Sequence, residues 1–330
     1  MDHVAIDWGG RESQICVRSS DGEIVDARRV RTAQLQAYLA RRPPSRVLIE
    51  ACSQAFSIAD QARAQGHEVR VVPPTLVRLL GVGERHTKND RRDAEALSRA
   101  SCRVELPSVH IPSKESRERK AICTSRDALV RSRTLLVNAV RAALRADGRS
   151  VRGTPETLPP RLRAIADELP AHLRSLVTVL ECLNGEIGQA DRELQRLAKR
   201  DELCRRLMTV PGVGPITALR FKAVIDDVSR FDDAHAVQSY LGLVPGQYAS
   251  SDKQHRLGIT KAGSVRLRAS LVQAAWCARR CRRQPLMVQW SLEVEKRRGK
   301  HVAVVAMARK LVGVLFAMWR DGTEYDPTRA

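Results

Sequence analysis

The chain has 330 residues, of which 43% are hydrophobic, so it is long enough and apolar enough to fill the cores of two or three domains. Its 57 Lys and Arg exceed its 37 Asp and Glu, which gives a formal charge of +20. Such a charge repels itself unless a polyanion balances it, so nucleic acid is the leading partner. Aromatic residues make up only 4% of the chain, which argues against a basic protein anchored on a membrane surface.

Nothing in the sequence indicates export or membrane insertion. The first residues, MDHVAIDWGG, lack the basic and apolar regions of a signal peptide. The apolar run at residues 301–319 contains Arg309 and Lys310, each of which would cost about 3 kcal/mol at a bilayer centre, so we expect a core helix. The eight cysteines form no Cys-x-x-Cys pair, and neither a zinc site nor a disulfide framework is indicated. We therefore expect a cytoplasmic protein.

The first 75 residues alternate between strand-like and helix-like patterns. Residues 3–30 form three short alternating stretches with a turn at Ser20-Asp21-Gly22, which predicts three consecutive antiparallel strands. Helical residues 32–40 lead to the strand VLIE, which ends at Glu50, and a helix at residues 57–65 precedes the strand EVRVVPP. Strands alternating with helices predict an α/β sheet.

The middle of the chain predicts two long helices. Residues 113–147 form a basic helical pattern, and glycines and prolines break it between residues 148 and 160. The next helix has apolar residues three and four apart, which is a heptad seam. Its members are Leu173, Leu176, Leu180, Leu183, Ile187, Ala190, Leu194 and Leu197. The seam fits a hairpin whose arms bury each other, and it fits a coiled-coil contact between subunits.

After residue 203 the pattern changes to short helices separated by glycine turns. Residues 250–330 contain 17 Lys and Arg but only 6 Asp and Glu, a local charge of +11. This part of the chain is therefore expected to form a DNA or RNA surface.

Four carboxylates stand where strands and a helix would meet at one edge. Asp7 lies in the apolar strand VAID, Glu50 closes VLIE, and Asp90 and Asp93 lie three apart at a helix start. Such a cluster repels itself unless a divalent cation occupies it, and Mg²⁺ prefers carboxylates, waters and phosphates. Singly, Asp90 could be a helix cap and Glu50 a solvated strand end. Asp7 is harder to explain in that way, because a buried unpaired carboxylate is costly.

The order of these acids resembles the RuvC-like, ribonuclease-H-type nuclease fold. Between residues 3 and 320 the chain resembles the DEDD transposases of the IS110 family of bacterial insertion sequences. The resembling segments, in order, are AIDWG, VLIEAC, KNDRRDA, VPGVGPITA, YLGLVP and ITKAGS. The resemblance implies a RuvC-like DEDD catalytic domain (1–110), a helical hairpin or coiled coil for oligomerisation and nucleic-acid contact (111–203), and a helical C-terminal transposase domain (204–330).

The resemblance also places a DNA-attacking serine in the segment YLGLVPGQYASSDKQHRLGITKAG, at Ser250. Ser251 stands where the family usually has glycine, so it is the alternative nucleophile. A serine hydroxyl needs activation before it can attack a phosphate, and Lys253, Arg256 and Lys261 would neutralise that phosphate. Without the resemblance, this stretch would be interpreted as a polar loop joining helices.

Gly212 and Gly214, in the segment VPGVGP, resemble a helix-hairpin-helix turn whose glycine amides bind a DNA phosphate. A tight turn between helices, without a ligand, is the alternative. No ligand spacing is found for His3, His86 or His301. Three tryptophans in apolar helical runs are expected in cores: Trp276, Trp290 and Trp319.

Together, the resemblance implies an insertion-sequence transposase or site-specific DNA recombinase. It would use Mg²⁺ held by Asp7, Glu50, Asp90 and Asp93, form a covalent phosphoserine link, and exchange strands between donor and target DNA under the guidance of a non-coding bridge RNA. Homodimers or homotetramers in the bacterial cytoplasm, at the nucleoid, are expected. The alternatives are a metal-dependent Holliday-junction resolvase-like nuclease without a covalent intermediate, and a non-catalytic nucleic-acid-binding scaffold.

Overall fold

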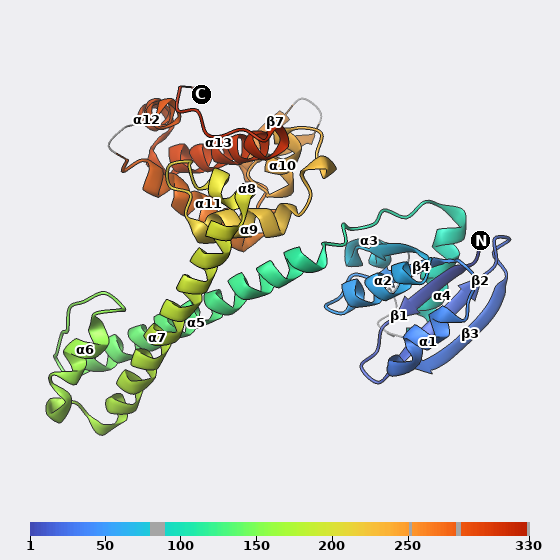
Figure 1. The fold of residues 1–330 in the computed structure, drawn as a ribbon, viewed down its shortest axis with the longest axis horizontal. Coiled ribbons are helices and arrows are strands. Elements are labelled where there is room, and N and C mark those ends of the chain that lie inside the picture. Colours follow the sequence, from blue (N-terminus) through green and yellow to red (C-terminus); the bar gives the residue numbers. More distant parts are fainter. Residues whose placement is uncertain (80–89, 251–252, 282–284, 329–330) are drawn as a thin grey trace. The chain divides into compact units, whose positions relative to one another are not determined.

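The chain divides into two units, Met1–Pro112 and Ser113–Ala330 (Figure 1). The structure is a computed structural model that describes residues 1–79, 90–250, 253–281 and 285–328. The first unit is a mixed sheet covered by helices, and the second, where the structure describes it, is helical apart from one strand pair. The α/β character predicted for the first part of the chain is therefore confirmed, and the second part is mainly helical, though not all-α.

The first unit is built on a five-stranded sheet of order β3-β2-β1-β4-β5. Its strands are β1 (His3–Asp7), β2 (Glu12–Arg18), β3 (Ile24–Arg31), β4 (Arg46–Glu50) and β5 (Glu68–Val72). The first three strands pair antiparallel, as their alternating pattern predicts. β4 joins the other side of β1 in parallel, and β5 is parallel to β4.

Helices cover both faces of this sheet. On one face, a short 3-10 turn (Thr32–Gln34), α1 (Leu35–Ala40) and α2 (Ala55–Ala64) follow β3 and β4, and α1 and α2 contribute to a buried cluster with the strands. On the other face, α3 (Pro74–Leu79) and α4 (Asp90–Arg103) complete a second cluster. Because both faces are buried, β1 and β4 are apolar along nearly their whole length.

Two long helices, α5 (Lys114–Ala146) and α7 (Ala171–Arg200), lie side by side in the second unit (Figure 1). Both agree with the predicted helical ranges. The hydroxyl of Ser113 caps α5 by accepting a hydrogen bond from the Ser116 N–H. The connecting segment holds α6 (Leu158–Arg163) and a 3-10 turn (Ala166–Glu168), and it packs on the ends of the long helices in its own buried cluster.

The heptad seam of α7 is buried unevenly. One row of the seam is at most 4% exposed, and it consists of Leu173, Leu180, Ile187 and Leu194. The alternate row, Leu176, Leu183, Ala190 and Leu197, is only half-buried. The arms are also tied by Arg126, whose guanidinium lies 2.8 Å from an Asp191 carboxylate oxygen. The two helices therefore bury each other along part of their length, whereas a coiled-coil contact between subunits stays a prediction.

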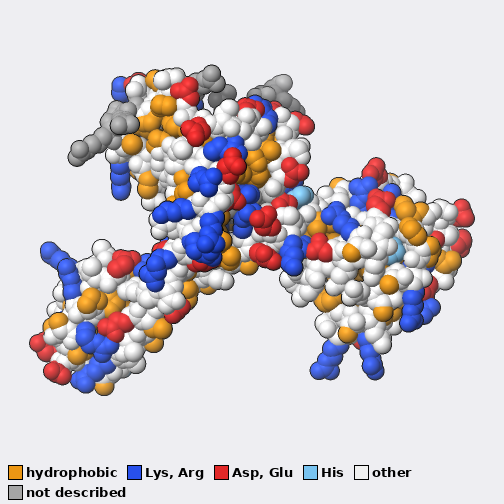
Figure 2. Space-filling model, viewed as in Figure 1, with side chains coloured by type: hydrophobic (Ala, Val, Ile, Leu, Met, Phe, Trp, Pro, Cys, Tyr) orange, Lys and Arg blue, Asp and Glu red, His pale blue; other side chains and the backbone are white. Residues whose placement is uncertain are grey.

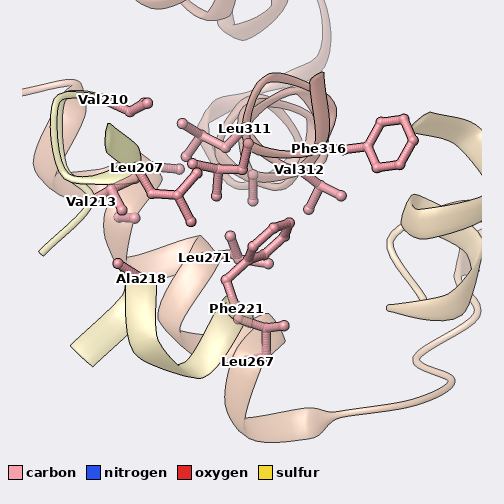
Figure 3. Packing of buried hydrophobic residues seen from close by; sticks show 14 of the residues in the cluster. Leu207, Val210, Val213, Ala218, Phe221, Leu267, Leu271, Leu311, Val312 and Phe316 are labelled. Carbon is pink, nitrogen blue, oxygen red and sulfur yellow. The ribbon is translucent and has the colours of Figure 1, made fainter. Parts of the chain in front are cut away.

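Among the described residues, six further helices follow α7 and surround a large hydrophobic core, which Figure 3 shows from close by. They are α8 (Glu202–Leu207), α9 (Pro215–Ile225), α10 (Ala234–Tyr240), α11 (Val265–Ala278), α12 (Leu286–Arg298) and α13 (Lys300–Asp321), and a 3-10 turn (Val228–Arg230) precedes α10. α13 is long and apolar enough to cross a membrane by composition. Its Leu311, Val312 and Phe316 are nevertheless buried in this core, which confirms the predicted core helix.

Two expectations about this unit need correction. The chain between α10 and α11 is an antiparallel strand pair, β6 (Pro245–Ser250) and β7 (Lys253–Ile259), where only helices and turns were predicted. Trp290 is 37% exposed, with the Lys310 ammonium 4.7 Å from its ring centre, so it is not a core residue. Trp276 and Trp319 do pack against the core. All eight cysteines lie in the described residues as free thiols, and three of them are buried: Cys16, Cys123 and Cys204.

A buried ionic contact joins α5, α7 and α9. Asp201, between α7 and α8, accepts hydrogen bonds from Arg119 at 3.0 Å, from Lys222 at 2.5 Å and from the Cys204 N–H at 3.0 Å. Burial by itself would raise the pKa of Asp201, but these hydrogen bonds and the nearby charges outweigh it and lower the pKa below 3.8. The ionised carboxylate therefore stabilises the fold.

We expect Asp201→Asn to lower the free energy of unfolding by about 1–3 kcal/mol at pH 7, because the half-buried Lys222 and Arg119 lose this carboxylate partner and Arg119 is left with Glu115. A carboxylate with a lowered pKa contributes its full stability above the unfolded value of about 3.9, and that contribution is lost as the pH falls through the folded value. Chemical denaturation from pH 7 to pH 3 should therefore show the gap between wild type and variant closing in acid. If the stability difference between wild type and variant stays constant with pH, the proposed role of the ionised Asp201 is contradicted. The control is Glu193→Gln, which removes a carboxylate from an exposed ion pair.

The core in Figure 3 gives a second stability prediction. Leu271 on α11 is 0% exposed, and Leu271→Ala should cost about 2–5 kcal/mol of unfolding free energy through lost burial and a cavity. Val265, on the same helix, is 66% exposed, so Val265→Ala should change stability by no more than about 0.5 kcal/mol. Equal losses in a denaturation experiment would show that α11 does not pack as described.

Candidate active site and nucleic-acid interface

Two of the predicted carboxylates end neighbouring parallel strands. Ile6 of β1 and Ile49 of β4 are the last registered pair, each 1% exposed, and Asp7 and Glu50 follow them directly. Both acids are half-buried. Because paired residues of parallel strands project to the same side, the two carboxylates share one face at one edge of the sheet.

The alternation of side chains identifies that face. Ala5 and Leu48 lie two residues before Asp7 and Glu50, so all four side chains project to the same side of the sheet. Ala5 and Leu48 are buried in the cluster that contains residues of α4. The carboxylates therefore lie on the face that α4 covers.

Polar contacts orient α4 on this face. Ser101, near the end of the helix, hydrogen-bonds His3 Nδ1 at 2.8 Å, at the start of β1. Ser98, one turn earlier, contacts Cys16 at 3.3 Å, and Cys16 is paired with Ala5 further along β1. Burial and the charge of Arg46 lower the pKa of His3, so its imidazole stays neutral in this contact. The helix thus runs opposite to β1.

This orientation directs the start of α4 toward the carboxylate edge. From Ser101 back to Asp93 the helix covers about 12 Å, and from His3 to Asp7 the strand covers about 13 Å. Asp93 is half-buried, and α4 begins at Asp90, as predicted. The side chain of Asp90 lies outside the described residues, as does His86. The fold thus brings Asp7, Glu50 and Asp93 toward one edge of the sheet.

The turn that follows Asp7 is held tightly. A side chain at Gly9 would meet the backbone oxygen of Glu12 at 1.9 Å, so only glycine fits there. Thr32 donates a hydrogen bond to the Gly9 carbonyl at 2.8 Å and contacts the Ser13 hydroxyl at 2.9 Å. The sequence carries no signal for the role of Thr32 and Ser13, because neither belongs to a chemical motif, whereas Gly9 stands in the AIDWG segment.

The donor chemistry of this edge suits a hard cation. Carboxylate oxygens are the ligands that Mg²⁺ prefers, and Asp7, Glu50 and Asp93 supply them. Within residues 1–79, 90–250, 253–281 and 285–328, no group of three His, Cys, Asp or Glu is close enough to hold a metal ion by itself. That search excludes the Asp90 side chain, the fourth predicted ligand.

The predicted nucleophile lies at the end of a strand hairpin. Ser250 is the last residue of β6 and pairs with Lys253, the first residue of β7. Ser251 and the side chains of Ser250, Lys253 and Arg256 lie outside the described residues. The polar loop of the alternative interpretation is thus an antiparallel strand pair, and the sequence offers little signal for it, since KQHRLGI has four consecutive polar residues and only Leu257 and Ile259 alternate.

Two glycines join the base of this hairpin to the start of α11. A side chain at Gly242 would meet the Ala262 N atom at 2.2 Å, and one at Gly263 would meet the Tyr240 oxygen at 2.1 Å. The guanidinium of the buried Arg268 donates to the carbonyl oxygens of Leu241 and Ala262 at 3.0 and 2.5 Å. The YLGLVP and ITKAGS segments thus form one packed unit.

Lys261, in this packed unit, is exposed and has a φ of +59°. A left-handed conformation is uncommon for a residue other than glycine, and at Lys261 it accompanies a hydrogen bond from its N–H to the Gly242 carbonyl at 3.1 Å. The packing at the hairpin base therefore positions this lysine at the surface.

The VPGVGP segment is a packed turn before α9. Gly212 has a φ of +85°, and a side chain there would meet the Ala274 oxygen of α11 at 2.1 Å, so helix packing explains this glycine. Gly214 is the N-cap residue of α9, and a side chain there would meet nothing within 4 Å. Phosphate binding at the N-terminus of α9 stays a prediction.

Basic side chains gather along the second unit. Figure 2 shows Lys and Arg over the middle of the paired long helices. Other basic side chains of this unit have structural partners, since Arg126 pairs with Asp191 and the buried Arg220 pairs with Asp127, both at 2.8 Å. The basic surface therefore contains fewer residues than the total of 57 Lys and Arg suggests.

Comparison with known proteins covers both units. Residues 4–146, which contain the carboxylate edge, match a transposase family model of the DEDD type of IS110. Residues 204–289, which contain the hairpin, match the model described as transposase IS116/IS110/IS902 family.

Curated relatives extend over most of the chain. The transposase for insertion sequence element IS1111A of Coxiella burnetii is 31% identical over 92% of this chain and 86% of its own length. A probable family 20 transposase of Pseudomonas aeruginosa is 30% identical over 99% of both chains. The pilin gene-inverting protein of Moraxella lacunata is 25% identical over 89% of this chain and 86% of its own length. The chain therefore belongs to the IS110 family of insertion-sequence transposases.

Proposed function

We propose that this transposase moves its insertion sequence by site-specific recombination, in which Ser250 forms a covalent link to DNA beside a divalent cation. The observation that carries the proposal is the pair of carboxylates, Asp7 and Glu50, on one face of neighbouring parallel strands. A relative named as a gene-inverting protein supports recombination, because inversion requires each cut strand to be rejoined.

Asp7, Glu50, Asp90 and Asp93 would hold the cation, which we propose to be Mg²⁺. Bound there, the cation would neutralise charge on the attacking and leaving oxygens of the scissile phosphate. The chain's own contribution is rigidity. The sheet register and the locked turn at Gly9 keep Asp7 in place, and the contacts of Ser98 and Ser101 hold α4 against the sheet.

In the proposed reaction the Ser250 oxygen forms a bond to phosphorus while the bond from phosphorus to one deoxyribose oxygen breaks. The serine proton leaves to solvent, and the departing oxygen takes up a proton to become a hydroxyl. Attack by a hydroxyl of the second DNA strand reverses these steps and releases Ser250. The number of phosphodiester bonds is conserved, so no nucleotide cofactor is needed. Lys253, Arg256 and Lys261 would neutralise the phosphate during both steps.

Nucleic-acid partners follow from the same proposal. A formal charge of +20 supports extensive contact with phosphates, and we propose donor DNA, target DNA and a bridge RNA as the partners. The half-buried row of the α7 seam supports a contact with a second copy, in a homodimer or homotetramer. These reactions would take place in the bacterial cytoplasm, at the nucleoid.

A second candidate is a metal-dependent nuclease similar to a Holliday-junction resolvase, without a covalent intermediate. The mixed sheet of order β3-β2-β1-β4-β5, with acids at the end of β1 and β4, supports it because it resembles the ribonuclease-H-type fold. Water would replace Ser250 as the nucleophile. The two candidates differ in whether protein remains attached to DNA.

The carboxylate edge gives the first functional prediction. Asp7→Asn and Glu50→Gln should each lower plasmid recombination at least about 100-fold, because a lost metal ligand removes several kcal/mol of transition-state stabilisation. DNA binding measured in EDTA should stay unchanged. The matched control is Asp21→Asn, an exposed carboxylate in the turn between β2 and β3, at the opposite end of the sheet. Full recombination activity of either variant would contradict the proposed metal site. If the wild type binds DNA but shows no Mg²⁺-dependent cleavage, a non-catalytic nucleic-acid-binding scaffold would be favoured instead.

The hairpin gives the second functional prediction. A DNA substrate trapped during reaction should leave a protein–DNA adduct on a denaturing gel, and Ser250→Ala should abolish that adduct while Ser251→Ala retains it. The reverse outcome would move the nucleophile to Ser251. Cleavage by the wild type with no adduct at all would instead support the hydrolytic nuclease.

A further inference from the structure

The far end of the paired helices contains a basic pocket that the proposed reaction does not use. It lies where α5 ends and the chain turns back toward α6, and it has a cavity volume of about 240 Å³. Four arginines line it, over an apolar floor of Leu144 and Val151. They are Arg141, Arg145, Arg149 and Arg152. None of the described residues that line it is acidic.

The ion pairs along α5 show why this pocket differs from the rest of the helix. Arg119, Arg126 and Arg133 follow one another at intervals of seven residues, and each contacts a carboxylate at 2.5–3.0 Å. These pairs fasten α5 to neighbouring segments. Beyond Arg133 the pattern stops, since Arg141 and Arg145 form no ion pair with any carboxylate that the structure describes.

The pocket is held open by bonds to the backbone. Arg141 donates to the Gly153 carbonyl at 2.6 Å, and Arg149 donates to the Glu168 carbonyl at 2.6 Å and lies 4.0 Å from the Glu168 carboxylate, outside the pocket lining. Gly153 has a φ of +152°, and a side chain there would meet the Thr157 hydroxyl at 3.0 Å, so the loop fits closely against the start of α6. The guanidinium groups of Arg145 and Arg152 donate to no other group in the described part of the chain, and both side chains are exposed.

Concentrated positive charge is costly for the fold unless an anion shares it. Guanidinium groups are the donors that best match the paired oxygens of a phosphate, because their N–H groups form a planar fork. Four such groups without a lining carboxylate fit the phosphodiester backbone of a nucleic acid. An acidic peptide is less favoured, because the chain belongs to a family of transposases, which act on nucleic acid.

We propose that this pocket, the arm-tip pocket, binds the phosphodiester backbone of DNA or RNA, with Arg145 and Arg152 making direct phosphate contacts and Arg141 and Arg149 shaping the loop. The contact would be independent of base sequence, because guanidinium–phosphate contacts carry no base information. It would add a second anchoring point for the long substrates of the enzyme. The inference rests on the proposed function only in that the enzyme acts on nucleic acid.

The test uses the full-length protein with Arg145→Gln and Arg152→Gln combined. The control combines Arg196→Gln and Arg320→Gln, which removes the same charge from arginines that already pair with Glu193 and Asp321. Affinity is measured across salt concentrations in EDTA, so that no strand is cut, with duplex DNA and single-stranded RNA of equal length. Circular dichroism and thermal unfolding check that each variant folds.

Each phosphate contact contributes about 0.9 to the slope of log affinity against log salt for duplex DNA, and about 0.7 for a single strand. Loss of two contacts, in the Arg145→Gln and Arg152→Gln double variant, should therefore reduce the magnitude of this slope by about 1.8 with DNA or by about 1.4 with RNA. The control variant should keep the wild-type slope. A change with only one probe identifies which nucleic acid occupies the pocket. Wild-type slopes with both probes, or equal changes in the control, would overturn the proposal. The protein–DNA adduct assay of Ser250 is a separate measurement from this binding assay. Failure of the proposed reaction and failure of the proposed pocket can therefore be distinguished.

Discussion

The parallel pairing of β1 with β4 is the contact on which the candidate active site depends. Its register aligns Ile6 with Ile49, so Asp7 and Glu50 follow on the same side. Because side chains alternate along a strand, a slip of one residue between the two strands would turn one carboxylate to the opposite face, under α1 and α2. Burial of Ile6 and Ile49 at 1% exposure opposes such a slip. The apolar core thus sets the geometry of a polar site.

Close backbone approach explains several of the recurring sequence segments. Gly9 permits the turn after Asp7, Gly212 lets the chain touch α11, and Gly242 and Gly263 join two segments at the base of the hairpin. In each case a side chain would lie within about 2 Å of a backbone atom, a distance that no relaxation of side chains can relieve. These motifs are therefore packing requirements, and they orient Asp7 and the strand that ends at Ser250, which are the residues of the proposed reaction.

Arginine has two different tasks in the second unit. Along α5 it holds helices together, and at Asp201 a buried carboxylate joins three elements through Arg119 and Lys222. At the end of α5, Arg141 and Arg145 have no carboxylate partner among the described residues and line a pocket instead. Since salt bridges within the fold occupy some of the 57 Lys and Arg, fewer of these side chains are available to phosphates than their number suggests. The distribution of partners separates structural from binding arginines.

The sequence by itself determined the elements whose signals are local. The alternation of residues 3–30, the 3.6-residue period of α5 and α7, and the apolar stretches that end at Asp7 and Glu50 all lie within single short segments, so they are visible without a fold. The core position of α13 follows from its apolar run and its interior charges in the same way.

Tertiary structure decided everything that depends on which distant segments meet. It placed Trp290 at the surface although apolar residues precede it in α12, made a hairpin of a segment interpreted as a loop, and selected the face of the sheet on which Asp7, Glu50 and α4 come together. It also decided which arginines have partners, since Asp191 lies 65 residues from Arg126 along the chain. Periodicity records only the neighbours of a residue along the chain, and contacts across the fold are set by how whole elements pack.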